Sequence, residues 1–161
     1  MPMKIFIISI LIILVCFIPI TAQAEYTAAP TQIIIPSVNI LLPVHTAKIV
    51  FNTWEVHLDG ASFGEGTQLP GNIGNTIIFS HARQNLFGNL PNIKKGDFIH
   101  VFTDYDWFVY QVNSLSVVSP QNIEVLENNN QYELTLYTCI GENYTKRFIV
   151  KAFLVSNPSL H

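Results

Sequence analysis

Charged side chains are scarce in this chain of 161 residues, because Asp, Glu, Lys and Arg together make up only 12% of it. Globular proteins usually contain about twice that share. The chain has no run of Lys or Arg, and since phosphate groups are bound by clustered basic residues, nucleic acid is not an expected partner. An internal repeat and a long amphipathic helical pattern are also absent. Hydrophobic residues make up 49% of the chain, which argues against disorder and suffices for one globular domain.

An uncharged apolar stretch runs from Ile5 to Ile20, directly after Lys4, and Ala22-Gln23-Ala24 follows it. This order is typical of a signal peptide that is cleaved after Ala24. Counted through Ala22, the stretch reaches about 18 residues, the lower limit for crossing a bilayer. Residues 1–24 are therefore expected to be a signal peptide or a membrane anchor, and residues 25–161 an extracytoplasmic domain.

Only two cysteines are present. Cys16 lies inside the apolar stretch, so Cys139 has no partner within the exported domain. Exported cysteines usually form disulfides, and an unpaired one therefore needs an explanation. Two readings remain at this point: a buried, inert cysteine that packs like a small hydrophobic residue, or a reactive thiol.

Eight segments rich in β-branched and aromatic residues predict strands, and hence an all-β barrel or sandwich. The Gly-rich stretch 59–74 is expected to be a loop, 84–93 a short helix or paired turns, and 119–131 a loop with one helical turn at 123–126. The predicted strands are 32–36, 39–44, 47–56, 75–81, 98–103, 107–118, 132–138 and 146–155.

Side chains alternate between the two faces of a strand. In the strand that begins at residue 132, Leu134, Leu136 and Thr138 share the more apolar face, which should point into the core. Cys139 then emerges on the opposite, more polar face at the end of the strand. If the last two strands form a hairpin, Arg147 on the second strand lies near Cys139 and places a cation close to the thiol.

The segment T-L-Y-T-C at 135–139, the arginine eight positions later and the upstream run 75–81, which ends in His81, together resemble the sortase family. Sortases are exported cysteine transpeptidases with an eight-stranded β-barrel. The resemblance extends over most of residues 32–155, including the stretch 33–44 and the Leu-Pro-Gly segment at 69–71.

The resemblance implies that Cys139 is the nucleophile, that His81 is the general acid and base, and that Arg147 holds the substrate and stabilises the oxyanion. These roles are chemically reasonable. A free thiol with a pKa near 8.5 is mostly protonated at neutral pH, and a nearby cation favours the reactive thiolate. Three further residues could contact the substrate: Thr138, Arg83 and Asn85.

The implied substrates are surface proteins with a C-terminal Leu-Pro-x-Thr-Gly-like sorting signal, and the implied acceptor is an amine of a peptidoglycan precursor or a pilin lysine. No cofactor is expected. Some sortases use calcium, but Glu124 and Glu127 have no evident partner set, so no metal is assigned. The Asp-Pro lid motif of pilin-polymerising sortases is missing, which favours the anchoring type.

Rival enzyme classes fit less well. L,D-transpeptidases place histidine and cysteine side by side in S-H-G-C-x-R, and papain-like cell-wall peptidases place the cysteine first. No two His or Cys residues have zinc-ligand spacing. His45, His57, His100 and His161 match no motif and are expected to be structural. The remaining alternative is an exported β-barrel binding or adhesion module without turnover.

Overall fold

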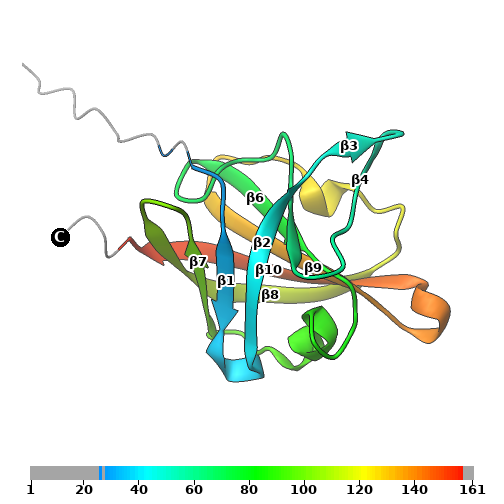
Figure 1. Cartoon of the computed structure of the whole chain (residues 1–161). Coiled ribbons are helices and arrows are strands. Elements are labelled where there is room, and N and C mark those ends of the chain that lie inside the picture. The colour runs from blue at the N-terminus through cyan, green and yellow to red at the C-terminus, as the bar shows by residue number, and fades with distance from the viewer. Residues whose placement is uncertain (1–25, 27, 158–161) are drawn as a thin grey trace, which may run out of the picture.

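The computed structural model describes Tyr26 and residues 28–157, so the apolar leader 1–24 and His161 lie outside the described residues. Eight strands close into a barrel in which β1 also pairs with β7 (Figure 1). Around the barrel they follow the order β1 (Gln32–Ile35), β2 (Ile40–Ala47), β5 (Ala61–Gly64), β6 (Gly74–Phe79), β9 (Tyr132–Ile140), β10 (Lys146–Ser156), β8 (Trp107–Val118) and β7 (Phe98–Phe102). The predicted all-β, eight-stranded barrel is confirmed.

Short 3-10 turns occupy four of the connections: η1 (Pro36–Val38), η2 (Phe87–Asn92), η3 (Glu124–Leu126) and η4 (Glu142–Tyr144). Two of them, η2 and η3, lie within segments for which the sequence predicts helical turns. The pairs β2–β5 and β6–β9 are parallel, and the other barrel pairs are antiparallel.

The number of barrel strands is as predicted, but one member differs. The predicted strand 47–56 is a separate small hairpin, β3 (Ile49–Val50) and β4 (Thr53–Trp54), because Phe51 and Asn52 turn the chain with φ values of 49° and 62°. The eighth barrel strand is β5, inside the stretch expected to be a loop. A Cβ on Gly64 would lie 2.9 Å from the Trp54 ring, so this glycine marks a close approach of the ring to the strand.

The barrel interior holds the main hydrophobic core. Leu134 and Leu136 are fully buried there and Thr138 is 1% exposed, which confirms the predicted inner face of β9. Tyr110 lies in the same core, and its hydroxyl accepts a hydrogen bond from the Gly71 N–H at 3.0 Å. Burial raises the pKa of Tyr110 to about 12.

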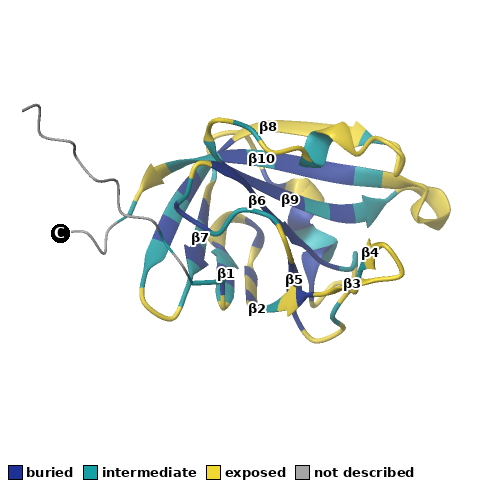
Figure 2. Ribbon diagram, turned by 90° about the horizontal axis from the view of Figure 1, so that it is seen from above, coloured by how far each residue is buried: buried dark blue, intermediate teal, exposed yellow. Residues whose placement is uncertain are grey.

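A second, smaller cluster lies outside the barrel. Ile77 and Phe79 of β6 alternate with the inward-facing Ile78, and Trp54, Leu126 and Tyr137 pack against them. The loop between β8 and β9 therefore covers the outer face of β6 and β9. Figure 2 shows the middles of β9 and β10 buried, while the β3–β4 hairpin and the β9–β10 connection are largely exposed.

Tyr26 lies at the end of the barrel opposite to Cys139. Tyr26 packs edge-on against Phe108 with ring centroids 4.9 Å apart, and its N–H donates to Asn72 Oδ1 just before β6 begins. Cys139 lies near the end of β9, which runs parallel to β6. The two points are thus at opposite ends of the parallel pair of β6 and β9. None of the helices in the described part of the chain is long and apolar enough to cross a membrane.

Candidate active site

Cys139 and Arg147 are direct partners across the β9–β10 hairpin. Side chains of directly opposite residues in an antiparallel pair lie on the same face, with Cβ atoms about 5 Å apart. The short connection expected from the sequence thus places the guanidinium-bearing residue beside the thiol. Both residues are partly exposed, and Cys139 is a free cysteine.

His81 approaches Cys139 from the other neighbouring strand. The parallel β6–β9 register pairs Phe79 with Tyr137, and the Ser80 N–H extends this ladder by donating to the Tyr137 carbonyl at 3.4 Å. The register ends there, and His81 follows Ser80 directly, so the chain carries His81 toward the end of β9 that bears Cys139. Neighbouring strands are about 5 Å apart. Cys139 and Arg147 are thus a register pair on β9 and β10, and His81 follows the end of β6, the other neighbour of β9, at the same end of the sheet.

Two buried hydroxyl groups fix the backbone just before His81. Thr138 Oγ1 donates to the Ser80 carbonyl at 2.9 Å, and Ser80 Oγ donates to the Gly60 carbonyl at 2.9 Å. Thr138 is 1% exposed inside the barrel. Its hydroxyl thus holds β9 to the segment that carries His81, and the contact of Thr138 with substrate stays a prediction.

The segment after His81 is a tight turn. The His81 carbonyl accepts a hydrogen bond from Phe87 N, and the Arg83 carbonyl accepts bonds from the N–H groups of Leu86 and Gly88. A Cβ on Gly88 would lie 2.5 Å from the Arg83 oxygen, so the turn requires glycine there. Arg83 is exposed on this turn, beside the position of His81, and Asn85 is exposed on it as well.

Arg147 is anchored by the β9–β10 connection. Its Nη1 donates to the carbonyls of Tyr144 and Lys146 at 3.1 and 3.2 Å. Tyr144 has a left-handed backbone (φ 58°), as does Asn143 (φ 53°), a conformation that costs free energy in residues other than glycine. Both anchoring bonds use Nη1, which leaves Nε and Nη2 of the guanidinium for a bound substrate.

A groove of about 190 Å³ lies next to the Cys139–Arg147 pair, and Arg147 is part of its lining. Tyr137, Arg147 and Ile149 form its side on the barrel, and the loop after β8 forms the opposite wall. Val118 at the end of β8 lines it together with the loop residues Ser119, Pro120, Asn122, Ile123, Val125 and Leu126. The groove combines apolar and polar lining groups with the Arg147 cation, a combination suited to a peptide.

Tyr137 lines the groove and lies two residues before Cys139 on the same face of β9. Its ring stacks on Phe79 with centroids 4.8 Å apart and planes 11° apart. Burial raises the pKa of Tyr137, Arg147 opposes that shift and Cys139 adds to it. The phenol therefore lies within electrostatic reach of both Arg147 and Cys139. Tyr137 thus both packs against Phe79 and lines the groove.

The other histidines within the described residues make local contacts. His45 lies 3.5 Å from Asp59 and its ring is 4.9 Å from that of His57, while the rings of His100 and Trp107 are stacked. Between Tyr26 and Asn157, no three His, Cys, Asp or Glu side chains group in a way that could hold a metal ion.

Cys139 supplies a thiol, His81 an imidazole that can carry a proton, and Arg147 a fixed positive charge. A thiolate attacks carbonyl carbon, and a cation beside it favours its formation. An imidazole can move a proton near neutral pH. A guanidinium can meet the charge that develops on an attacked carbonyl oxygen. These are the requirements of acyl transfer.

Known proteins share this sequence pattern. The family model of the sortase domain matches residues 33–155. Sortase A of Bacillus anthracis is 33% identical over 128 residues, which are 77% of this chain and 59% of that protein. Sortase A of Streptococcus agalactiae serotype III (strain NEM316) is 31% identical over 134 residues, 76% of this chain and 51% of that protein. The chain thus spans little more than half the length of these two relatives.

Solved structures share the fold. Sortase A of Listeria monocytogenes superposes with a TM-score of 0.69 and 27% identity, covering 81% of this chain and 88% of that one. A pilus-related sortase C of Group B Streptococcus gives a TM-score of 0.70 and 30% identity, with 82% of this chain and 70% of that one covered. The likeness therefore includes structures named for two sortase classes.

Proposed function

The chain belongs to the sortase family, and on that premise we propose that it is an extracytoplasmic cysteine transpeptidase with Cys139 as its nucleophile. The observation that carries the proposal is the register pair Cys139–Arg147. It puts a thiol and a guanidinium on one face of the barrel, beside a groove that Arg147 itself lines. The substrate is a protein with a Leu-Pro-x-Thr-Gly-like sorting signal, bound along that groove.

In the first half of the reaction the Cys139 thiolate attacks the carbonyl carbon of the Thr–Gly-type bond. Negative charge develops on the carbonyl oxygen, and Arg147 stabilises it. As the tetrahedral intermediate collapses, the C–N bond breaks and His81 gives a proton to the leaving amine. The sorted protein is then held as a thioester on Cys139.

In the second half an amine attacks the thioester carbonyl and gives its proton to His81, and the C–S bond breaks to release the Cys139 thiolate. The acceptor is an amine of a peptidoglycan precursor or a pilin lysine. The missing Asp-Pro lid motif favours the anchoring type of reaction. The apolar leader would hold the enzyme at the membrane or be removed after Ala24.

Mass spectrometry of the intact protein tests this proposal. Incubation with a peptide containing Leu-Pro-Ala-Thr-Gly should add the mass of the acyl fragment, and Cys139→Ala should abolish the adduct because the attacking sulfur is gone. Cys16→Ala is the matched control, since it removes the only other thiol of the chain and should leave the adduct intact. An adduct on the Cys139→Ala protein would refute the assignment. Peptide binding without any adduct would favour a binding module.

A further inference from the structure

The loop 119–131 forms one wall of the groove, but the hydrogen bonds within it join residues that are close in sequence. Leu126 N donates to the Ile123 carbonyl and Glu127 N to the Glu124 carbonyl, so these bonds shape turns within the loop. They do not determine where the loop sits on the barrel. That position depends on contacts between the loop and the strands beneath it.

The polar contacts of the loop with the barrel converge on the start of β6. Asn75 Nδ2 donates to the Glu127 carbonyl at 3.2 Å, and Asn75 N donates to Asn128 Oδ1 at 2.7 Å. Gly74 N donates to the Gln131 carbonyl at 2.7 Å. Asn75 is 2% exposed, so these bonds are shielded from water, and its side chain must be correctly oriented to make the first of them.

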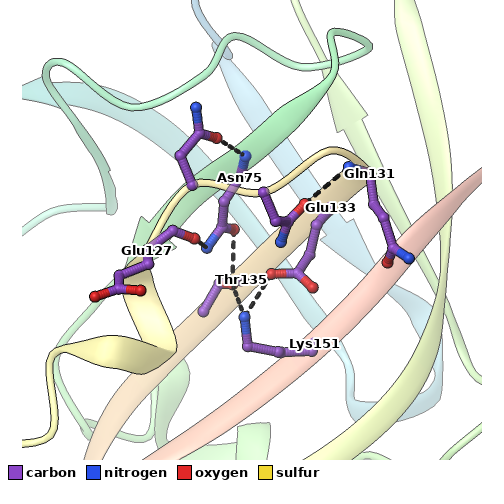
Figure 3. Close-up of polar contacts among 8 residues, drawn as sticks. Asn75, Glu127, Gln131, Glu133, Thr135 and Lys151 are labelled. Atoms are coloured by element: carbon purple, nitrogen blue, oxygen red, sulfur yellow. Dashed lines mark hydrogen bonds and ion pairs between the residues drawn. The ribbon is translucent and has the colours of Figure 1, made fainter.

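A directional series of hydrogen bonds sets that orientation (Figure 3). Thr135 Oγ1 donates to Asn75 Oδ1 at 2.7 Å, which turns the amide Nδ2 toward the loop. The Lys151 ammonium contacts Glu133 Oε1 and, at 3.5 Å, Thr135 Oγ1. An ammonium can only donate, so the Thr135 oxygen acts as acceptor toward Lys151 and its single proton remains for Asn75.

Glu133 is the competing acceptor for that proton, because its Oε1 lies 3.5 Å from Thr135 Oγ1. Lys151 pairs with the same carboxylate oxygen and so reduces the competition. Glu133 and Thr135 are 5% and 0% exposed. A buried polar network in which every member has a partner favours one arrangement over its alternatives.

We infer that Lys151, Thr135 and Asn75 form a relay that fixes the groove-forming loop 119–131 and thereby sets how tightly the sorting signal is recognised. These are positioning residues, since they act through the loop and lie away from the reacting atoms. The inference rests on the proposed function for its substrate. Fixation of the loop itself can be measured without turnover.

Thr135→Val is the principal test, because valine has the shape of threonine but neither accepts nor donates. Hydrogen exchange followed by mass spectrometry should show faster exchange of the loop amides at 122–127. With the Leu-Pro-Ala-Thr-Gly peptide, KM should rise about five- to tenfold while kcat stays nearly constant, the effect of one lost buried hydrogen bond on binding. The rate at which a small methanethiosulfonate labels Cys139 should not change.

Thr135→Ser separates the relay from simple packing. Serine keeps the hydroxyl and loses the methyl group. The relay therefore predicts that Thr135→Ser has near-normal hydrogen exchange and KM, and that Thr135→Val changes both. A packing role predicts the reverse order and would overturn the inference. Gln111→Ala is the control on another part of the barrel, since it removes a side-chain bond to the Gly96 carbonyl, and it should change neither readout.

Peptide affinity in the Cys139→Ala background, measured by fluorescence anisotropy, makes the test independent of catalysis. Weaker binding with Thr135→Val supports the relay even if turnover is never seen, in which case only the proposed function fails. Loop exchange or affinity that is unchanged by Thr135→Val overturns the relay, even in an active transpeptidase.

Discussion

Strand β9 has one face inside the barrel and one outside, and the two can be compared residue by residue. Inside, Leu134 and Leu136 are fully buried in the main core, and Thr138 bonds to a backbone carbonyl. Outside, the same strand carries Glu133, Thr135, Tyr137 and Cys139. Glu133 and Thr135 belong to a buried polar network, whereas the Cys139 thiol is partly exposed.

The difference shows how one short element serves both folding and chemistry. The inner face gains stability by removing apolar surface from water. The outer face has a gradient along the strand: the end at Glu133 is covered by the loop, and the end at Cys139 is open to a substrate. Substitutions on the two faces should therefore have separable effects on activity and on stability.

The largest of these effects is expected outside the barrel, at Arg147. Arg147→Lys keeps the positive charge, but an ammonium has three donors and no planar fork, so bonds to the carbonyls of Tyr144 and Lys146 would leave a single donor for a substrate. Loss of one such donor typically costs about 3–4 kcal/mol of transition-state stabilisation, so kcat/KM should fall by two to three orders of magnitude, by about that estimate. The measurement is steady-state transpeptidation, with thermal unfolding as the control.

The melting temperature of Arg147→Lys should stay close to that of the unchanged protein, because the residue is partly exposed. A rate near that of the unchanged protein would show that Arg147 only stabilises the hairpin connection. In that case Arg147 would have no role in the reaction, and only Cys139 and His81 of the proposed catalytic groups would remain.

The corresponding test inside the barrel is Leu136→Ala. Leu136 is fully buried, and truncation of such a side chain leaves a cavity and costs about 2–5 kcal/mol of stability. Denaturant unfolding should show this loss, whereas kcat/KM at a temperature where the variant is folded should change little. A fall in activity without loss of stability would contradict the separation of the two faces.

The smallest effect concerns alkaline pH and the core residue Tyr110. Its pKa is about 12 in the folded protein and 10.0 in the unfolded chain, so the folded state holds the proton at higher pH. Stability from this group is complete below pH 10 and is lost as the pH rises from 10 toward 12. Tyr110→Phe should therefore make the alkaline decline in stability less steep, as measured by urea unfolding at several pH values.

Tyr137 also has a raised pKa and contributes to the same decline, so the slope should be reduced and not removed. At neutral pH, Tyr110→Phe should cost about 1 kcal/mol, because the Gly71 N–H loses its acceptor. An alkaline profile identical to that of the unchanged protein would show that Tyr110 is not a source of this pH dependence.

Local patterns in the sequence predicted the parts of the fold that depend on neighbouring residues. Alternation assigned the faces of β9 correctly, and the short connection before Arg147 correctly predicted the β9–β10 hairpin. The same reasoning failed at β5, where Gly64 suggested a loop. Glycine is required there because Trp54 lies against the strand, a contact that the local sequence does not reveal.

The sequence by itself determined the all-β class, the unpaired thiol at residue 139 and the motif that identifies the family. Only the tertiary structure paired Cys139 with Arg147, set β6 and β9 side by side in parallel, formed the groove against Tyr137 and linked Thr135 to Asn75, 60 positions away. The physical reason is that strand periodicity is a property of adjacent residues. Pairing between distant strands is decided only when the barrel closes and each buried polar group must find a partner.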